Sequence, residues 1–276
     1  MQEMGIRFLN GPDKADKGLE DVEPGDIILI PAFGTTVAEL EDLKKKGCLL
    51  VDTTCGSVVA VWKRVEKYAA DGFTALIHGK YNHEETQATS SRAGKYLVVR
   101  DKEEAQNVCD YIVNGGDRER FLACFAKASS PGFDPDRDLE RLGCANQTTM
   151  LSSESLEIAN MLQEAMTRRY GAEALSEHFR HFDTICSATQ ERQDAVLALL
   201  AGQKLDLMIV IGGYNSSNTS HLLEIAQHAG VPGYHVKDAA CIRSKGAIEH
   251  KLLGSPDPAV TTSWLPEGKI MVGITA

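Results

Sequence analysis

Two cysteines occupy the same place in a short pattern that occurs twice in the chain. The segments Asp52-Thr53-Thr54-Cys55 and Asp183-Thr184-Ile185-Cys186 each follow an apolar or aromatic run and precede helix-forming residues. Each cysteine is therefore predicted to lie on a turn between a strand and a helix. The free N–H groups and the positive dipole end of such a helix favour the thiolate, which is the reactive and metal-binding form of cysteine. Two turns about 130 residues apart suggest sites that meet in space.

A structural role is the alternative for these thiols, because free cysteine often behaves as a small buried hydrophobe. That role is expected for Cys109, Cys124, Cys144 and Cys241. Zinc would need further ligands at close spacing, so a pair of thiolates favours an iron–sulfur site or a redox pair. Seven scattered cysteines without a Cys-x-x-Cys motif are typical of a reducing compartment, either the cytosol or an organelle stroma.

A second group of polar residues follows the apolar run 74–77. His78, Lys80, His83 and Glu85 lie within eight residues and combine donors for an anion with a source of protons. A carboxyl group beside an apolar ligand would have a raised pKa and could act as a general acid. The alternative is an ordinary surface histidine beside a solvated glutamate.

The segment Gly212-Gly213-Tyr214-Asn215-Ser216-Ser217-Asn218-Thr219 is predicted to bind a phosphate group. Its glycines let the backbone approach a ligand, and its hydroxyl and amide groups precede a helix whose dipole favours an anion. The segment matches neither the Walker loop nor the dinucleotide-binding glycine pattern. An ordinary helix cap rich in serine and asparagine is the alternative.

Alternating apolar runs and amphipathic segments predict an α/β fold with mostly parallel sheets. Strands are expected at 27–30, 48–51, 74–77, 96–99, 207–211, 234–236 and 270–272, and the first of them reads as fully buried. Helices are expected at 37–46, 58–69, 102–113, 117–127, 152–170, 192–200 and from the 212–219 segment to 229. The polar segments described above all follow strands, where ligands collect in such sheets.

The composition favours a small-molecule partner. The chain has 276 residues, of which 43% are hydrophobic, and a net charge of −10. The longest basic cluster is Lys44-Lys45-Lys46, which disfavours binding to nucleic acid or to an anionic membrane. No apolar run approaches the roughly 18 residues of a membrane span.

Taken together and in order, these segments resemble the LytB-type 4-hydroxy-3-methylbut-2-enyl diphosphate reductases. The matching motifs are 52–55, 77–86, Ala145-Asn146-Gln147-Thr148-Thr149-Met150, 184–193 and 213–219, which span nearly the whole chain. The loop Pro31-Ala32-Phe33-Gly34 and the string His83-Glu84-Glu85-Thr86 resemble the plant and cyanobacterial branch.

The resemblance implies three similar α/β lobes around a central four-iron four-sulfur cluster. The expected lobes are 1–55, as an incomplete first lobe, 56–182 and 183–276. Cys55 and Cys186 match two of the three cysteines that hold the cluster in this family. Glu85 matches the proton donor and Thr148 a hydroxyl near the substrate. The residues that match diphosphate ligands are His83, Ser216, Ser217 and Asn218.

The implied reaction is a two-electron reductive dehydroxylation in the methylerythritol phosphate pathway of isoprenoid synthesis. Its products would be isopentenyl and dimethylallyl diphosphate, and ferredoxin or flavodoxin would supply the electrons in the cytoplasm or a plastid stroma. The family's first cluster cysteine, in a Gly-Phe-Cys segment, and its C-terminal Gly-Ala-Ser segment have no counterpart here. The chain is therefore expected to be truncated at both ends.

Two other functions are compatible with the same residues. A decayed homologue or fragment would bind a diphosphate through His83 and the segment 216–218 without turning it over. A cysteine-dependent redox or hydrolytic enzyme would use Cys186 alone.

Overall fold

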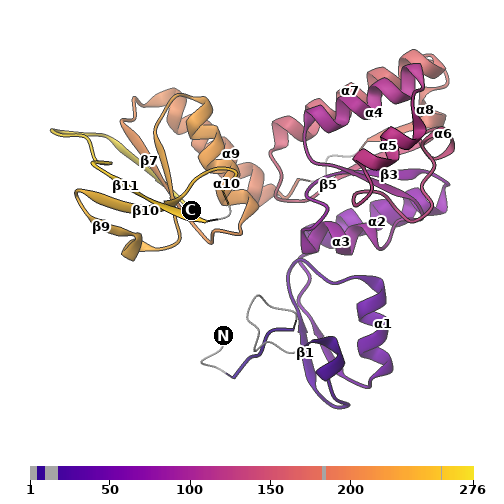
Figure 1. Cartoon of the computed structure of the whole chain (residues 1–276), viewed down its shortest axis with the longest axis horizontal. Coiled ribbons are helices and arrows are strands. Elements are labelled where there is room, and N and C mark those ends of the chain that lie inside the picture. The colour runs from indigo at the N-terminus through magenta and orange to yellow at the C-terminus, as the bar shows by residue number, and fades with distance from the viewer. Residues whose placement is uncertain (1–4, 10–17, 182–184, 256) are drawn as a thin grey trace. The chain divides into compact units, whose positions relative to one another are not determined.

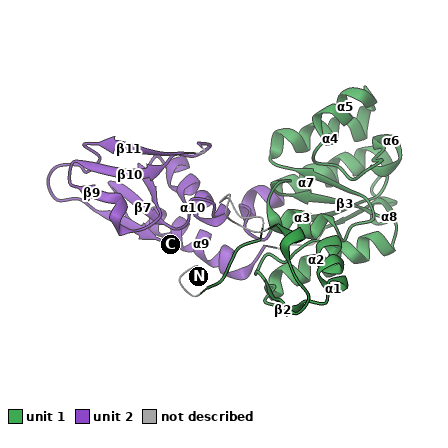
Figure 2. Cartoon of the chain, turned by 60° about the horizontal axis from the view of Figure 1, so that its bottom comes forward, with its two compact units in different colours: residues 1–147, 157–184 green, residues 148–156, 185–276 purple. Residues whose placement is uncertain are grey.

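The fold of the chain is mixed α/β, as predicted, and divides into two compact units (Figures 1 and 2). The computed structural model describes residues 5–9, 18–181, 185–255 and 257–276. Unit 1 comprises residues 1–147 and 157–184, and unit 2 comprises residues 148–156 and 185–276. Helices and strands alternate in both units, and most strand pairs within the described ranges are parallel.

The first part of unit 1 is a small strand–helix–strand element. Strand β1 (Ile27–Ile30) pairs in parallel with β2 (Leu49–Asp52), and helix α1 (Val37–Lys45) connects them. Thr36 begins α1 with a capping box, because its hydroxyl accepts the N–H of Glu39 while the Glu39 carboxylate accepts the N–H of Thr36. A short 3₁₀ turn (Leu19–Asp21) precedes β1.

The prediction that strand 27–30 is fully buried is wrong. Ile27 is 70% exposed and Leu29 49%, and on the neighbouring strand Leu49 is 60% and Val51 42% exposed. Side chains alternate across a strand, so these four share one face of the two-stranded sheet. The other face packs on α1, where Ile30 and Leu43 are buried together. The parallel pairing itself is as predicted.

The larger part of unit 1 is a four-stranded parallel sheet. Its strands run in the order β4 (Tyr96–Val99), β3 (Thr74–His78), β5 (Leu142–Asn146) and β6 (Phe179–His181). Helices α4 (Lys102–Asn114) and α7 (Ser152–Tyr170) cover one face and α2 (Gly56–Ala70) the other (Figure 1). Short helices complete the unit, namely α3 (Glu84–Ser90), α5 (Arg118–Cys124), α6 (Pro135–Asp138) and α8 (Leu175–His178). The sequence patterns did not predict β5, whereas the aromatic run before Cys186 predicted a strand where β6 lies.

Unit 2 is built on a six-stranded sheet. Its parallel part holds β7 (Leu207–Ile211), β8 (Gly233–Val236) and β12 (Val272–Thr275). An antiparallel extension continues from β8 through β10 (Ala247–Lys251) to β11 (Pro258–Thr262), and β9 (Ile242–Ser244) pairs with β10. A 3₁₀ turn (Ala239–Cys241) leads into β9. Helices α9 (Ser187–Gly202) and α10 (Ser217–His228) pack together, with Val196 and Leu222 buried in one core with Met208 of β7.

The other cysteines divide between the core and the surface. Cys109, Cys144 and Cys241 are buried, as predicted, whereas Cys124 is exposed, so the prediction of a buried role for it is wrong. Burial raises the pKa of the Cys109 thiol to about 12. Cys124 is the last residue of α5 and faces outward from a short surface helix. None of these four thiols forms a disulfide.

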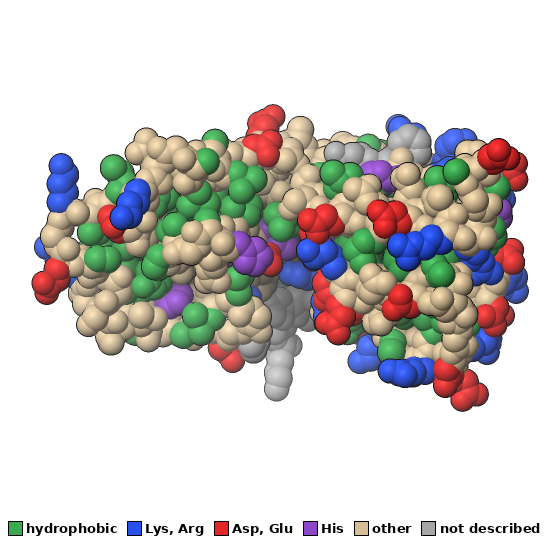
Figure 3. Space-filling view, turned by 90° about the horizontal axis from the view of Figure 1, so that it is seen from above, with side chains coloured by type: hydrophobic (Ala, Val, Ile, Leu, Met, Phe, Trp, Pro, Cys, Tyr) green, Lys and Arg blue, Asp and Glu red, His purple; other side chains and the backbone are tan. Residues whose placement is uncertain are grey.

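The described surface of unit 1 mixes charges of both signs. Over the face drawn in Figure 3, Lys and Arg side chains lie among Asp and Glu side chains. Ion pairs among the described residues of unit 1 include Lys102–Glu157 at 2.7 Å and Arg100–Glu104 at 3.4 Å. Opposite charges at this spacing cancel beyond a short range, so this face carries no extended positive field. Within the described ranges, no helix has the length and apolar character to cross a membrane.

Candidate functional site

Cys55 is the N-cap residue of α2 and follows the end of β2, so the predicted strand-to-helix turn is confirmed. Thr53 donates its N–H and its hydroxyl to the carbonyl of Ile30, at 3.1 and 2.5 Å. Asp52 accepts the hydroxyl of Thr54 at 2.6 Å and its N–H at 2.9 Å, and these hydrogen bonds hold the pKa of Asp52 below its usual value. The polar residues fix the turn and leave the Cys55 side chain exposed.

Cys186 has the matching position in unit 2, as the N-cap residue of α9. Its carbonyl accepts the N–H of Gln190 at 3.0 Å, which begins the helix, and its own N–H donates to the carbonyl of Thr148 at 3.3 Å. The side chain of Cys186 is half-buried and Thr148 is 4% exposed. Unit 2 therefore brings Cys186 and Thr148 together. Asp183 and Thr184 of the repeated pattern lie outside the described residues.

His83 and Glu85 lie where β3 leads into α3. His83 is the N-cap residue of α3, and its Nδ1 accepts the N–H of Glu85 at 3.2 Å. Burial lowers the pKa of His83, Lys80 lowers it further and Glu84 opposes the change. Glu85 is 0% exposed, so its interpretation as a solvated surface glutamate is wrong. The ring of His83 is therefore held neutral beside a carboxyl group from which water is excluded.

The contacts of α2 and α3 bring these two parts of unit 1 together. Val58 and Trp62 of α2 pack against Ala88 of α3 in one buried cluster. The edge of the Phe33 ring lies against His83, with ring centroids 5.2 Å apart and ring planes at 79°. Val58 belongs to the first turn of α2, next to its N-cap cysteine. Cys55, His83 and Glu85 thus lie on two helix starts that share a packing interface.

Gln147 holds the polar loop between β3 and α3 in place. Its Oε1 accepts the N–H of Lys80 at 3.2 Å and the hydroxyl of Thr86 at 3.1 Å. A side chain at Gly79 would lie 2.9 Å from the Thr86 hydroxyl, so this close approach needs glycine. The sequence pattern gave no role to Gln147, although it directly precedes Thr148.

The predicted anion-binding segment forms the turn between β7 and α10. Ser216 is the N-cap residue of α10, a helix of 12 residues, and its Oγ accepts the N–H of Thr219 at 3.2 Å. Ser217 is 4% exposed, and the Oδ1 of Asn218 is buried with no hydrogen-bond partner among the described residues. A Cβ at Gly212 would lie 2.3 Å from the Thr219 hydroxyl. The turn is tightly closed and directs polar groups to the start of a helix, where an anion is stabilised.

Two basic residues that contact this turn had no signal in the sequence. His235 of β8 lies with its Nε2 2.9 Å from the carbonyl oxygen of Gly212. Lys251 of β10 donates from Nζ to the carbonyl of Tyr214 at 2.7 Å. Both come much later in the chain than the turn, and the pairing of β8 and β10 brings them to it. Only the sheet register could have identified them.

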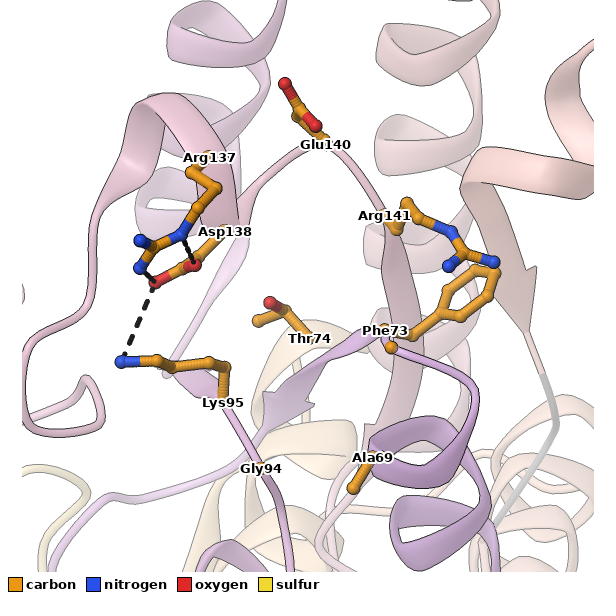
Figure 4. Close-up of a pocket in the computed structure, with 10 residues that line it drawn as sticks. Ala69, Phe73, Thr74, Gly94, Lys95, Arg137, Asp138, Glu140 and Arg141 are labelled. Carbon is orange, nitrogen blue, oxygen red and sulfur yellow. Dashed lines mark hydrogen bonds and ion pairs between the residues drawn. The ribbon is translucent and has the colours of Figure 1, made fainter.

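A separate cavity of about 340 Å³ lies in unit 1 at the end of the sheet where its strands begin (Figure 4). Its lining includes residues that precede β3, β4 and β5, whereas the candidate side chains follow the ends of strands. Asp138 there is paired with Arg137 at 2.8 Å and Lys95 at 3.9 Å, and Arg141 stacks on Phe73 at 4.1 Å. Lys95, Arg137 and Asp138 are thus paired with one another, and none of the candidate side chains lines this cavity, so it is not the candidate site.

Each unit thus holds one N-cap cysteine and one set of polar residues. Unit 1 contributes Cys55, His83 and Glu85, and unit 2 contributes Cys186 with Thr148 and the turn at 216–218. Within the described ranges, no three His, Cys, Asp or Glu side chains gather into a metal-binding group. The thiols are the groups most suited to a soft metal such as iron in a cluster.

Comparisons with known proteins show the family of the chain. The model of the LytB protein family matches residues 1–276. The 4-hydroxy-3-methylbut-2-enyl diphosphate reductase of Thermosynechococcus vestitus is 53% identical over 279 residues, which cover 100% of this chain and 68% of that protein. The reductase of the same name from Gloeothece citriformis is 56% identical over 277 residues, with the same coverage.

One solved structure supports the fold. The E-1-hydroxy-2-methyl-but-2-enyl-4-diphosphate reductase from Plasmodium falciparum superposes with a TM-score of 0.63 at 21% sequence identity. The superposition covers 94% of this chain and 64% of that one. At this identity the similarity concerns the α/β architecture.

Proposed function

Because the chain belongs to the LytB protein family, we propose that it performs the reductive dehydroxylation of 4-hydroxy-3-methylbut-2-enyl diphosphate. The products are isopentenyl and dimethylallyl diphosphate, in the methylerythritol phosphate pathway of isoprenoid synthesis. The observation that carries the proposal is the 53% and 56% identity to reductases over the whole of this chain. The same agreement does not favour a decayed homologue or a hydrolytic enzyme that uses Cys186 alone.

Cys55 and Cys186 are suited to hold an iron–sulfur cluster. The side chain of Cys55 is exposed and that of Cys186 is half-buried, and neither caps its helix with a side-chain hydrogen bond. The thiolate is the form of cysteine that binds iron. A four-iron four-sulfur cluster, when bound, supplies electrons and a Lewis-acidic iron for the substrate hydroxyl. These two cysteines are two of the three ligands that the family uses.

Glu85 supplies the proton for the departing hydroxyl group in this proposal. The side chain is fully buried, and exclusion of water by itself favours the protonated form of a carboxyl group. A protonated carboxyl can donate to the oxygen as its bond to carbon breaks, so that water leaves instead of hydroxide. Thr148, buried beside Cys186, contributes a hydroxyl near the substrate.

His83 and the turn 216–218 bind the diphosphate. Since Nδ1 of His83 accepts the N–H of Glu85, the neutral ring carries its hydrogen on Nε2, which can donate to a phosphate oxygen. Ser216, Ser217 and Asn218 add hydroxyl and amide groups at the start of α10. These donors fix the anionic end of the substrate and so orient its hydroxyl end.

The electrons come from ferredoxin or flavodoxin in a reducing compartment, either the cytoplasm or a plastid stroma. The seven free cysteines are compatible with such a compartment.

Serine substitutions test the cluster ligands. The chain is reconstituted with iron and sulfide without oxygen, and iron content and absorbance at about 400 nm are measured. We expect Cys55→Ser and Cys186→Ser each to lower both signals, while Cys124→Ser, at an exposed thiol, leaves them unchanged. Reductase activity on 4-hydroxy-3-methylbut-2-enyl diphosphate should fall with them. Equal iron content in all four proteins would contradict the proposal.

A further inference from the structure

The turn between β7 and α10 is held by side chains of β8 and β10 in the unit 2 sheet. Lys251 donates to the carbonyl of Tyr214 at 2.7 Å, and His235 lies 2.9 Å from that of Gly212. His235 is 1% exposed, and burial lowers its pKa, so its ring is neutral and acts as a donor through Nε2–H. Two carbonyls of a three-residue stretch therefore face β8 and β10.

The Tyr214 side chain strengthens this attachment. Its ring packs edge-on against His235, with centroids 5.3 Å apart, and its hydroxyl lies 3.5 Å from the sulfur of buried Cys241. The carbonyl of Tyr214 is thus held by Lys251, and its side chain is held by His235 and Cys241. The turn cannot rotate about this residue without breaking a charge-assisted hydrogen bond and leaving packed groups.

The orientation of the carbonyls fixes the opposite groups of the same peptide planes. In a trans peptide the C=O of one residue and the N–H of the next point in opposite directions. The N–H groups of Gly213 and Asn215 therefore point away from β8 and β10. No described residue accepts a hydrogen bond from either N–H group. Neighbouring N–H groups that converge without a partner form a concave anion site.

We propose that Lys251 and His235 are positioning residues, which hold the carbonyls of Gly212 and Tyr214 so that the N–H groups of Gly213 and Asn215 are directed to the substrate diphosphate. The inference rests on the proposed function. It adds two backbone N–H donors to the diphosphate site, together with the two side chains that orient them. Lys251 acts from the side of the turn opposite to the ligand and does not touch the substrate. Its positive charge also raises the electrostatic potential at the turn.

The test uses inorganic diphosphate and the full chain. Binding is measured by titration calorimetry, and the amide resonances of Gly213 and Asn215 are followed by NMR. We expect Lys251→Met to weaken binding about tenfold, which is the loss of one charge-assisted hydrogen bond, and to shift both amide resonances before ligand is added. Lys251→Arg keeps a charged donor and should restore both signals.

Lys245→Met is the matched control, because it removes the same charge from an exposed position between β9 and β10. It should bind diphosphate as the unaltered chain does. In the reconstituted reductase, Lys251→Met should raise KM and leave kcat within about twofold, because the lost interaction stabilises the bound substrate and the transition state equally.

Three results would overturn the inference. Equal affinity of the unaltered chain and of Lys251→Met for diphosphate would overturn this inference but not the proposed diphosphate site. Loss of affinity without any shift of the Gly213 and Asn215 resonances in the free protein would identify Lys251 as a direct ligand instead. Failure of diphosphate to perturb the turn of the unaltered chain would overturn the proposed diphosphate site and this inference with it.

Discussion

Ser216 performs two tasks that one substitution can separate. Its Oγ accepts the N–H of Thr219 at 3.2 Å and so caps α10, and in the proposed function the same hydroxyl faces the diphosphate. Ser216→Ala removes both contributions. Ser216→Asp restores the cap, because aspartate is as good an N-cap residue as serine, but places a negative charge where the diphosphate must bind.

The structure sets the expected size of each effect. Loss of a serine N-cap costs about 1 kcal/mol, and α10 transmits this to the core because Leu222 and Leu223 are buried there. For a unit of about 100 residues such as unit 2, the midpoint of thermal unfolding should fall by roughly 4–8 °C. Loss of one hydrogen bond to a charged ligand should weaken diphosphate binding about tenfold or more.

Thermal unfolding by circular dichroism and titration with inorganic diphosphate measure the two effects on the same samples. Asp117→Ala is the matched control, since Asp117 caps α5 by accepting the N–H of Arg120 at 3.0 Å and lies in unit 1. It should lower stability by a similar amount, because it also removes one N-cap. Its affinity for diphosphate should not change.

The unfolding temperatures and diphosphate affinities of the two Ser216 variants together separate the capping role from the binding role. We expect Ser216→Asp to unfold at the temperature of the unaltered chain and to bind no diphosphate. If it unfolds as early as Ser216→Ala, the capping argument fails. If Ser216→Ala binds diphosphate as tightly as the unaltered chain, its hydroxyl is not a ligand.

Two more substitutions test the close packing and the proton donor. Gly212→Ala should destabilise the chain by about 1–3 kcal/mol, because its Cβ would lie 2.3 Å from a threonine hydroxyl in α10, whereas Gly213→Ala meets nothing within 4 Å and should be nearly neutral in thermal unfolding. Equal destabilisation by both would contradict the steric argument. Glu85→Gln keeps the volume of a buried side chain but removes the acid, so kcat should fall about 10²- to 10⁴-fold with little change in KM. Glu84→Gln, at an exposed neighbour, should retain full reductase activity, and unchanged kcat in both would rule out Glu85 as the donor.

The sequence predicted the elements whose residues follow one clear period. Strands β3, β4 and β7 read as short β-branched runs, and α2, α9 and α10 follow strands with an N-cap residue between them. The cysteine turns and the anion-binding turn were therefore identifiable. The division into lobes at 55 and 182 stays a prediction.

The parts that were missed depend on tertiary contacts. Strand β10 alternates as a strand should, with Ile248 and His250 buried and Glu249 and Lys251 half-exposed. Because the buried position 250 is occupied by histidine instead of an apolar residue, the sequence shows no alternation of apolar and polar residues there. In β1 the opposite error arose, because an all-apolar run reads as buried although its residues alternate between α1 and solvent. The contact of Lys251 with the turn between β7 and α10 depends on strand pairing, so it cannot be predicted from the local sequence.

The two N-cap cysteines have a consequence for the design of these helices. A thiol is a weak acceptor, and neither Cys55 nor Cys186 makes a side-chain hydrogen bond to its helix, whereas a serine there would satisfy one further N–H group. Both helices therefore begin with a residue that is inferior for folding, by about 1 kcal/mol each. A sequence tuned for stability alone would carry oxygen at both places. In the proposed function these sulfur atoms hold the cluster, so replacing both with the oxygen of serine should give a chain that unfolds at a higher temperature but has no reductase activity.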